Sequence, residues 1–95
     1  MNEAQILAAV KTDLRISVSA YDTRLLQLIE SATEAIIAEG ASTLNPSASA
    51  EDAQLVIMYA DWLWSSNGSK DATMPRSLRW KLNNRVFGEK AGAAT

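Results

Sequence analysis

The sequence predicts an all-α fold: a small four-helix domain with a long central helix pair and a short C-terminal helix. Two observations predict it. Apolar residues recur at the spacing of helix faces in four segments, and each segment starts at residues that commonly begin helices. The length of 95 residues favours one domain. We expect it to cover residues 1–88, followed by a flexible tail over residues 89–95.

The first predicted helix covers residues 3–13. Asn2 precedes it as an N-cap, because an Asn side chain can accept from the free N–H groups of a first turn. Its apolar residues share one helix face: Leu7, Val10 and Leu14. Residues 16–19 alternate apolar and polar side chains, which predicts an extended link.

The second predicted helix covers residues 21–39. Ser19 and Asp22 resemble a capping box, and Gly40 stands where a left-handed C-cap belongs. The apolar stripe consists of Leu25, Leu28, Ile29, Ala32 and Ile36, and Leu26 and Ile37 widen it.

The third predicted helix covers residues 50–66, with a second capping-box-like start at Ser49 and Asp52. Residues 55–64 are apolar almost all round, and only Asp61 interrupts them. A helix that is apolar on every side must be covered on every side. We therefore expect this to be the central helix, with one face in the domain core and another packed against something else.

The last predicted helix covers residues 75–87. Pro75 suits its first position, and Gly88 is expected to end it. Its core face consists of Leu78, Leu82 and Val86.

The composition argues against an enzyme. The chain has no Cys and no His, which excludes disulfides, thiol nucleophiles, Cys/His zinc sites and imidazole acid–base chemistry. We predict no catalytic, cofactor-binding or metal-binding residues. No apolar run approaches the ~20 residues of a membrane helix, and the N-terminus lacks the pattern of a signal peptide, so a cytosolic chain without membrane contact is expected.

Two acidic features allow a functional and a plain interpretation. Asp61 could be a buried acid with a shifted pKa, or an acid that faces solvent or pairs with an Arg of the last helix. Glu30 and Glu34 could share a metal or act as an acid–base pair, or form a solvated helix face. We favour the plain interpretation for both, because no His, Cys or further carboxylate cluster supports chemistry.

Charge is distributed unevenly along the chain. Residues 1–69 hold nine acids and three bases, a net −6, whereas residues 70–95 hold six bases and two acids, a net +4. This asymmetry and the preference of binding hot spots for Arg and aromatic residues favour partner docking by the last helix over DNA contact, although a plain surface stays open. The candidate docking residues are Arg76, Arg79, Trp80, Arg85 and Phe87.

The third helix carries two tryptophans that cannot share one small core. Trp62 and Trp64 point ~200° apart on a helix. At least one of them should lie at a domain edge or a subunit contact. The candidate subunit-interface residues are Leu26, Ile37, Tyr59, Trp62 and Trp64.

Several segments together resemble a known family. Residues 10–16 read Val-Lys-Thr-Asp-Leu-Arg-Ile, residues 22–32 fit Asp-x-x-Leu-Leu-x-Leu-Ile-x-x-Ala, residues 53–67 form an aromatic-rich helix, and Pro75 opens the last helix. Over about residues 4–87 this pattern is similar to the small head–tail connector (adaptor, or head-completion) proteins of long-tailed bacteriophages.

The resemblance implies a structural subunit without catalysis or cofactor. Such a subunit forms a ring of about twelve copies beneath the portal protein, through two different patches on each copy. The ring extends the DNA channel, which DNA passes without sequence-specific binding, and offers a docking surface to the tail through a tail-completion or stopper protein. The protein would be made in the bacterial cytoplasm and reside in the virion at the head–tail interface.

Two other classes of function compete with this one. A small helical DNA-binding regulator would need a turn of about 3–4 residues before a basic recognition helix, and the connection over residues 67–73 is longer. An enzyme subunit or toxin is disfavoured by the absence of His and Cys.

Overall fold

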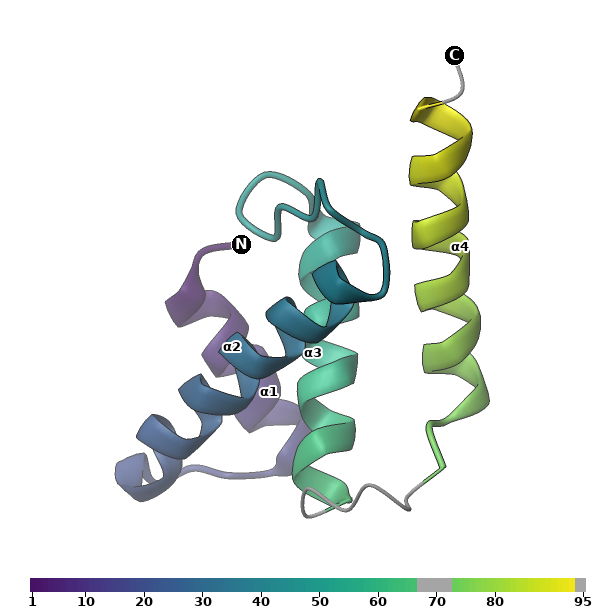
Figure 1. Cartoon of the computed structure of the whole chain (residues 1–95). Coiled ribbons are helices and arrows are strands. Elements are labelled where there is room, and N and C mark those ends of the chain that lie inside the picture. The colour runs from purple at the N-terminus through teal and green to yellow at the C-terminus, as the bar shows by residue number, and fades with distance from the viewer. Residues whose placement is uncertain (67–72, 94–95) are drawn as a thin grey trace.

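The computed structural model describes residues 1–66 and 73–93, and within them the backbone forms four α-helices and one short 3₁₀ turn (Figure 1). The elements are α1 (Glu3–Leu14), η1 (Ser19–Tyr21), α2 (Asp22–Ala38), α3 (Ala50–Ser65) and α4 (Arg76–Ala93). The all-α, four-helix fold predicted from the sequence is therefore confirmed.

Helix α3 lies at the centre of the molecule. Helices α1, α2 and α4 all pack against it, and in Figure 1 α4 runs antiparallel to α3 along one edge. The largest fully buried side chains come from all four helices: Val10, Leu25, Ile36, Leu55, Val56, Leu78 and Leu82. The chain's own helices thus cover most of the apolar surface of α3, which is the central helix that the sequence predicts.

The helix starts agree only partly with the predicted caps. Asn2 caps α1 in a full capping box, because its side chain accepts from the Gln5 N–H and the Gln5 side chain accepts from the Asn2 N–H, both at 2.8 Å. The box predicted at Ser19 does not form, since residues 19–21 adopt the 3₁₀ turn. The Asp22 carboxylate instead accepts from Lys11 at 2.7 Å, which ties the start of α2 to α1.

Gly40 ends α2, as the sequence predicts, and allows α4 to approach. Its φ of +129° lies in a region that L side chains rarely adopt. A Cβ at this position would come within 2.9 Å of Val86 Cγ1 on α4. The absence of a side chain at Gly40 therefore sets how closely the end of α2 packs against α4.

Helix α4 is longer than predicted. It passes through Gly88 and continues to Ala93, so the expected stop at Gly88 and the expected short C-terminal helix are wrong. Glu89 explains part of the extension, because its carboxylate accepts from the Ser42 hydroxyl and from the Thr43 N–H. The predicted tail from residue 89 is thus helical up to Ala93, and residues 94–95 lie outside the described part of the chain.

Among the described residues, we find no helix with the length and apolar character needed to cross a membrane.

Candidate functional site

The outer face of α4 carries the two most exposed large apolar side chains among the described residues. Trp80 is 68 % exposed and Phe87 is 74 % exposed. They are seven residues apart, which places them on the same side of the helix about two turns apart. We call this side the α4 outer face, and its residues are Arg76, Trp80, Asn83, Asn84 and Phe87.

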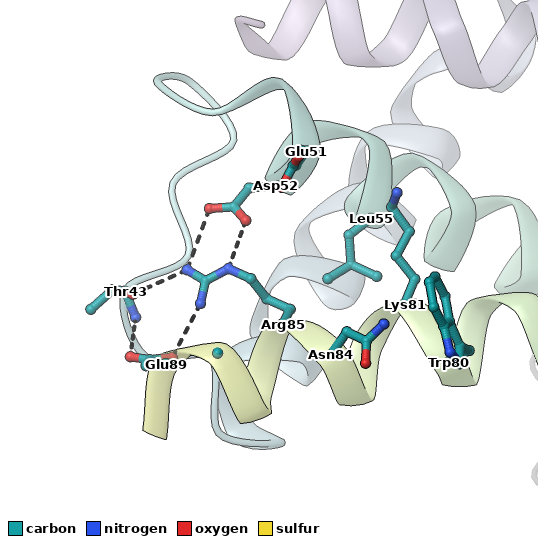
Figure 2. A pocket seen from close by; sticks show the side chains of 10 residues that line it. Thr43, Glu51, Asp52, Leu55, Trp80, Lys81, Asn84, Arg85 and Glu89 are labelled. Atoms are coloured by element: carbon teal, nitrogen blue, oxygen red, sulfur yellow. Dashed lines mark hydrogen bonds and ion pairs between the residues drawn. The ribbon is translucent and has the colours of Figure 1, made fainter. Parts of the chain in front are cut away.

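The opposite side of α4 is fixed to the body of the molecule. Leu78 and Leu82 are buried in the core. Arg85 continues this side as a polar anchor: its Nε donates to Asp52 Oδ1 at 2.8 Å, and its Nη2 donates to Thr43 Oγ1 at 3.0 Å. Its Nη1 lies 3.5 Å from Glu89 Oε2 one turn further along α4. Figure 2 shows these groups converging on the guanidinium.

Asp52 is the buried member of this network, with its side chain only 7 % exposed. Burial alone would raise its pKa, but the hydrogen bond from Arg85, the Asn45 N–H at 2.9 Å and the Arg85 charge together hold the pKa of Asp52 below its ordinary value. The hydrogen bond to Asp52 in turn raises the pKa of Arg85. The pair is therefore charged under all ordinary conditions.

The structure changes the role of two predicted docking residues. Arg85 is held within the molecule by its bonds to Asp52, Thr43 and Glu89, so its assignment to an exposed docking surface is wrong. Arg79 is exposed but lies 3.7 Å from Glu39 at the end of α2. The other three predicted docking residues are exposed: Arg76, Trp80 and Phe87. Arg76 forms no ion pair among the described residues.

A hollow of about 620 Å³ lies beside the anchor, between α4 and the start of α3 (Figure 2). Trp80, Lys81 and Asn84 line it from α4, and Glu51 and Leu55 line it from α3. Its mixed lining joins directly onto the α4 outer face at Trp80. It therefore extends the surface that α4 offers to a partner.

The predicted subunit-interface residues do not form one surface. Tyr59 is only 9 % exposed and belongs to the core, so it cannot serve as a contact for a neighbouring subunit. Trp62 packs edge-on against Tyr59, and Trp64 packs edge-on against Tyr21, which leaves both tryptophans half-buried. This agrees with the expectation that both cannot enter the core. On α2, Leu26 is half-buried and Ile37 is 40 % exposed.

Asp61 is neither on a solvent stripe nor paired with an Arg of α4. It is half-buried on α3 against the Asp13 carboxyl of α1, and its Oδ1 is buried without a hydrogen-bond partner among the described residues. Burial, a hydrogen bond with Asp13 and the charge of Asp13 raise the pKa of Asp61 to about 8. The plain interpretation that we favoured is therefore wrong.

The described residues offer no constellation for metal chemistry, because no three or more Asp or Glu side chains gather as a ligand set there. Glu30 and Glu34 are both exposed on α2, as a solvated face requires. Comparison with protein-family models, with curated proteins and with solved structures finds no match in any of the three.

The residues that position α4 were not foreseen from the sequence as a group. Asp52 was expected to help cap α3, and indeed Ser49 accepts from the Asp52 N–H at 3.2 Å. The Asp52 carboxylate, however, turns to Arg85. Thr43 and Glu89 lie 46 residues apart in the chain, and no sequence periodicity connects a loop residue with a distant helix.

Proposed function

We propose that this chain is a structural, non-catalytic subunit of a phage head–tail connector, which assembles into a ring beneath the portal protein. The ring would extend the DNA channel and offer a docking surface to a tail-completion or stopper protein. The site of action would be the head–tail interface of the virion, after synthesis in the bacterial cytoplasm. The proposal joins the sequence resemblance to one structural observation.

That observation is the outer face of α4. The helix is held against the body by Leu78, Leu82 and Arg85, so Trp80 and Phe87 are presented on a fixed support. Exposed aromatic side chains on a fixed helix are typical of protein contact surfaces, since little conformational entropy is lost when a partner covers them. A structural subunit that joins other proteins needs such a surface.

A DNA-binding regulator is less well supported. Of the four cations on the first three turns of α4, Arg85 is engaged by Asp52 and Arg79 lies beside Glu39. Two acidic partners reduce the positive charge that the helix can offer to phosphates. The segment between α3 and α4, residues 66–75, is also longer than the turn of a helix-turn-helix.

The test is co-expression of the chain with the portal protein encoded in the same genome. We expect the two to co-purify and to form a complex with rotational symmetry in negative-stain micrographs. The matched control is the double variant W80S/F87S, which should fold equally well. A genome without a portal gene, or a portal that fails to retain the wild-type chain, would contradict the proposal. Tight binding of duplex DNA that weakens steeply with salt would favour the regulator instead.

A further inference from the structure

Five side chains of α4 follow the spacing of a seam between two packed helices. They recur at alternating intervals of four and three residues, and all five are exposed: Arg76, Trp80, Asn83, Phe87 and Lys90. This alternation is the a/d pattern of a coiled coil, in which residues spaced 3.5 apart on average stay along one stripe of the helix. We call this stripe the α4 seam. It lies on the side of α4 away from the buried Leu78 and Leu82.

A second helix is the shape that such a seam fits. Trp80 and Phe87 take the same position one heptad apart, so each side chain can insert between the side chains of a facing helix. The whole seam spans fourteen residues, or about 21 Å of helix, so the facing helix needs about four turns. In Figure 1 α4 runs along one edge of the molecule, and no helix of the chain faces its outer side.

The α4 seam carries positive charge at both ends and no acidic side chain. Neither Arg76 nor Lys90 forms an ion pair among the described residues. The only acidic residue of α4 is Glu89, and its carboxylate is held on the inner side by Ser42 and Thr43. A helix with carboxylates opposite the two ends of the seam is therefore attracted, whereas a basic helix is repelled.

The chain itself holds no helix that matches this charge pattern. The exposed acids of α2, Glu30 and Glu34, stand four residues apart, whereas the two cations of the seam stand fourteen residues apart. No two acidic residues in the whole sequence are separated by fourteen positions. A second copy thus offers no helix that could face both cations at once, and this favours a different protein as the occupant.

We propose that the α4 seam receives an acidic amphipathic helix that belongs to another protein. The apolar side chains of that helix would cover Trp80 and Phe87. Its carboxylates would lie opposite Arg76 and Lys90. This inference deepens the proposed function and rests on it, because it states which kind of segment a connector subunit would bind through its α4 outer face.

The groups of the seam would contribute differently to such a contact. The two aromatic side chains supply most of the buried area and act as anchors. The cations at the two ends set the orientation of the helix and discriminate against basic helices. Asn83 lies between the aromatic residues, and a polar side chain within a seam favours a polar residue opposite, which fixes the register. Because the cations are exposed, binding should weaken as salt rises.

The test uses the full chain and three synthetic peptides. The acidic peptide is an amphipathic helix that repeats the spacing of the seam, with Glu at its two end positions, Leu at its two aromatic positions and Asn at its centre. The basic peptide has Lys in place of those Glu residues. The scrambled peptide has the composition of the acidic peptide without the amphipathic spacing. The variants are R76E/K90E and W80S/F87S, and the control is E3K, a charge reversal at an exposed residue of α1.

Fluorescence anisotropy of the labelled peptides at low salt gives the dissociation constants. We expect wild type and E3K to bind the acidic peptide alike, at least about tenfold more tightly than the basic or the scrambled peptide. R76E/K90E should reverse the preference and bind the basic peptide more tightly. W80S/F87S should lose binding of the acidic peptide. Circular dichroism confirms that every variant is folded, so a loss of binding reports on the seam.

The inference is overturned if wild type binds no peptide, if it binds the acidic and basic peptides equally, or if R76E/K90E keeps the preference of wild type. Binding of a single-stranded oligonucleotide in place of the acidic peptide would assign the seam to nucleic acid. Self-association that R76E/K90E abolishes, without peptide binding, would assign the seam to a second copy. Either result overturns the inference.

The same experiment separates this inference from the connector role. A portal that fails to retain the chain, together with the expected peptide preferences, would remove the connector role and leave the helix-binding seam standing. A portal that retains the chain, together with a failure of the acidic peptide to bind, would remove the inference and leave the connector role standing.

Discussion

Arg85 of α4 and Asp52 of α3 form a hydrogen-bonded ion pair at 2.8 Å, on the same side of α4 as the buried Leu78 and Leu82. Asp52 also accepts from Asn45, so the pair joins α4 to both α3 and the loop before it. With α4 oriented in this way, Trp80 and Phe87 face outward. The orientation of α4 thus accounts both for the Arg85–Asp52 contact and for the exposure of Trp80 and Phe87.

Replacing Arg85 with Ala should destabilise the fold by about 2 kcal/mol, because it leaves the buried Asp52 carboxylate without its cation. Urea denaturation measures this change in the free energy of unfolding. The matched control is R76A, which removes an exposed Arg without an ion pair among the described residues and should stay within about 0.5 kcal/mol of wild type. Equal stabilities of the two variants would show that the anchor contributes nothing.

The same pair predicts a loss of stability in acid. The pKa of Asp52 is lower in the folded chain than its ordinary value of 3.8, so the unfolded chain binds its proton more readily. The stabilisation is present above pH ~4 and should disappear as the pH falls through the folded pKa. The D52N variant should lack this part of the acid transition in a series of thermal melts, although it is less stable at neutral pH. An unchanged acid transition in D52N would assign it to other carboxyl groups.

Asp61 should act in the opposite direction. Its pKa of about 8 lies above the ordinary 3.8, so the folded chain holds the proton more tightly than the unfolded chain. Its contribution to stability is therefore complete below pH ~4 and is lost as the pH rises towards 8. D61N should match wild type near pH 4 and be more stable by roughly 1 kcal/mol at pH 8, after allowance for partial exposure.

The control for this prediction is E34Q, which removes an exposed carboxylate for which the structure gives no comparable burial. Thermal melts of D61N and E34Q at pH 4, 6 and 8 would separate the two residues. A stability difference between D61N and wild type that does not grow with pH would show that Asp61 does not hold its proton more tightly in the folded chain than in the unfolded chain.

Gly40 should tolerate no side chain. G40A places a Cβ at a φ of +129° and within 2.9 Å of Val86 Cγ1, so we expect a loss of about 1–2 kcal/mol in a denaturant titration. G88A is the control, because nothing lies within 4 Å of a Cβ at Gly88 and the residue is in the middle of a helix. There Ala should stabilise the chain by about 0.5–1 kcal/mol. A neutral G40A would mean that α4 can move away from the end of α2.

The sequence was sufficient for features that depend on neighbours in the chain. The Asn2 cap, the Gly40 end of α2, the buried stripe of α2 and the buried Leu78 and Leu82 of α4 all follow from local spacing. Contacts between segments that are distant in the sequence could not be predicted from local spacing. A Gly at position 88 predicts a helix end locally, but the bonds of Glu89 to residues 42 and 43 hold the helix beyond it.

The candidate site was predicted in part for the same reason. The exposed pair Trp80 and Phe87 was among the predicted docking residues, since basic and aromatic residues cluster in the last helix. Arg85 was placed on the wrong side because its partner Asp52 lies 33 residues earlier. Tyr59 was assigned to an interface because an all-apolar helix cannot show by periodicity alone which of its sides the neighbouring helices cover.

The central claim is that the inner face of α4 stabilises the fold, whereas its outer face makes the contacts through which copies or partners associate. Native mass spectrometry of wild type and W80S/F87S at tens of micromolar protein, each mixed with the acidic peptide, tests this most directly, with V18S as a control that removes an exposed apolar side chain elsewhere. We predict peptide complexes for wild type and V18S, none for W80S/F87S, and melting temperatures of the free chains that agree within a few degrees for all three. A distribution of complexes that is the same for W80S/F87S and wild type would contradict the account.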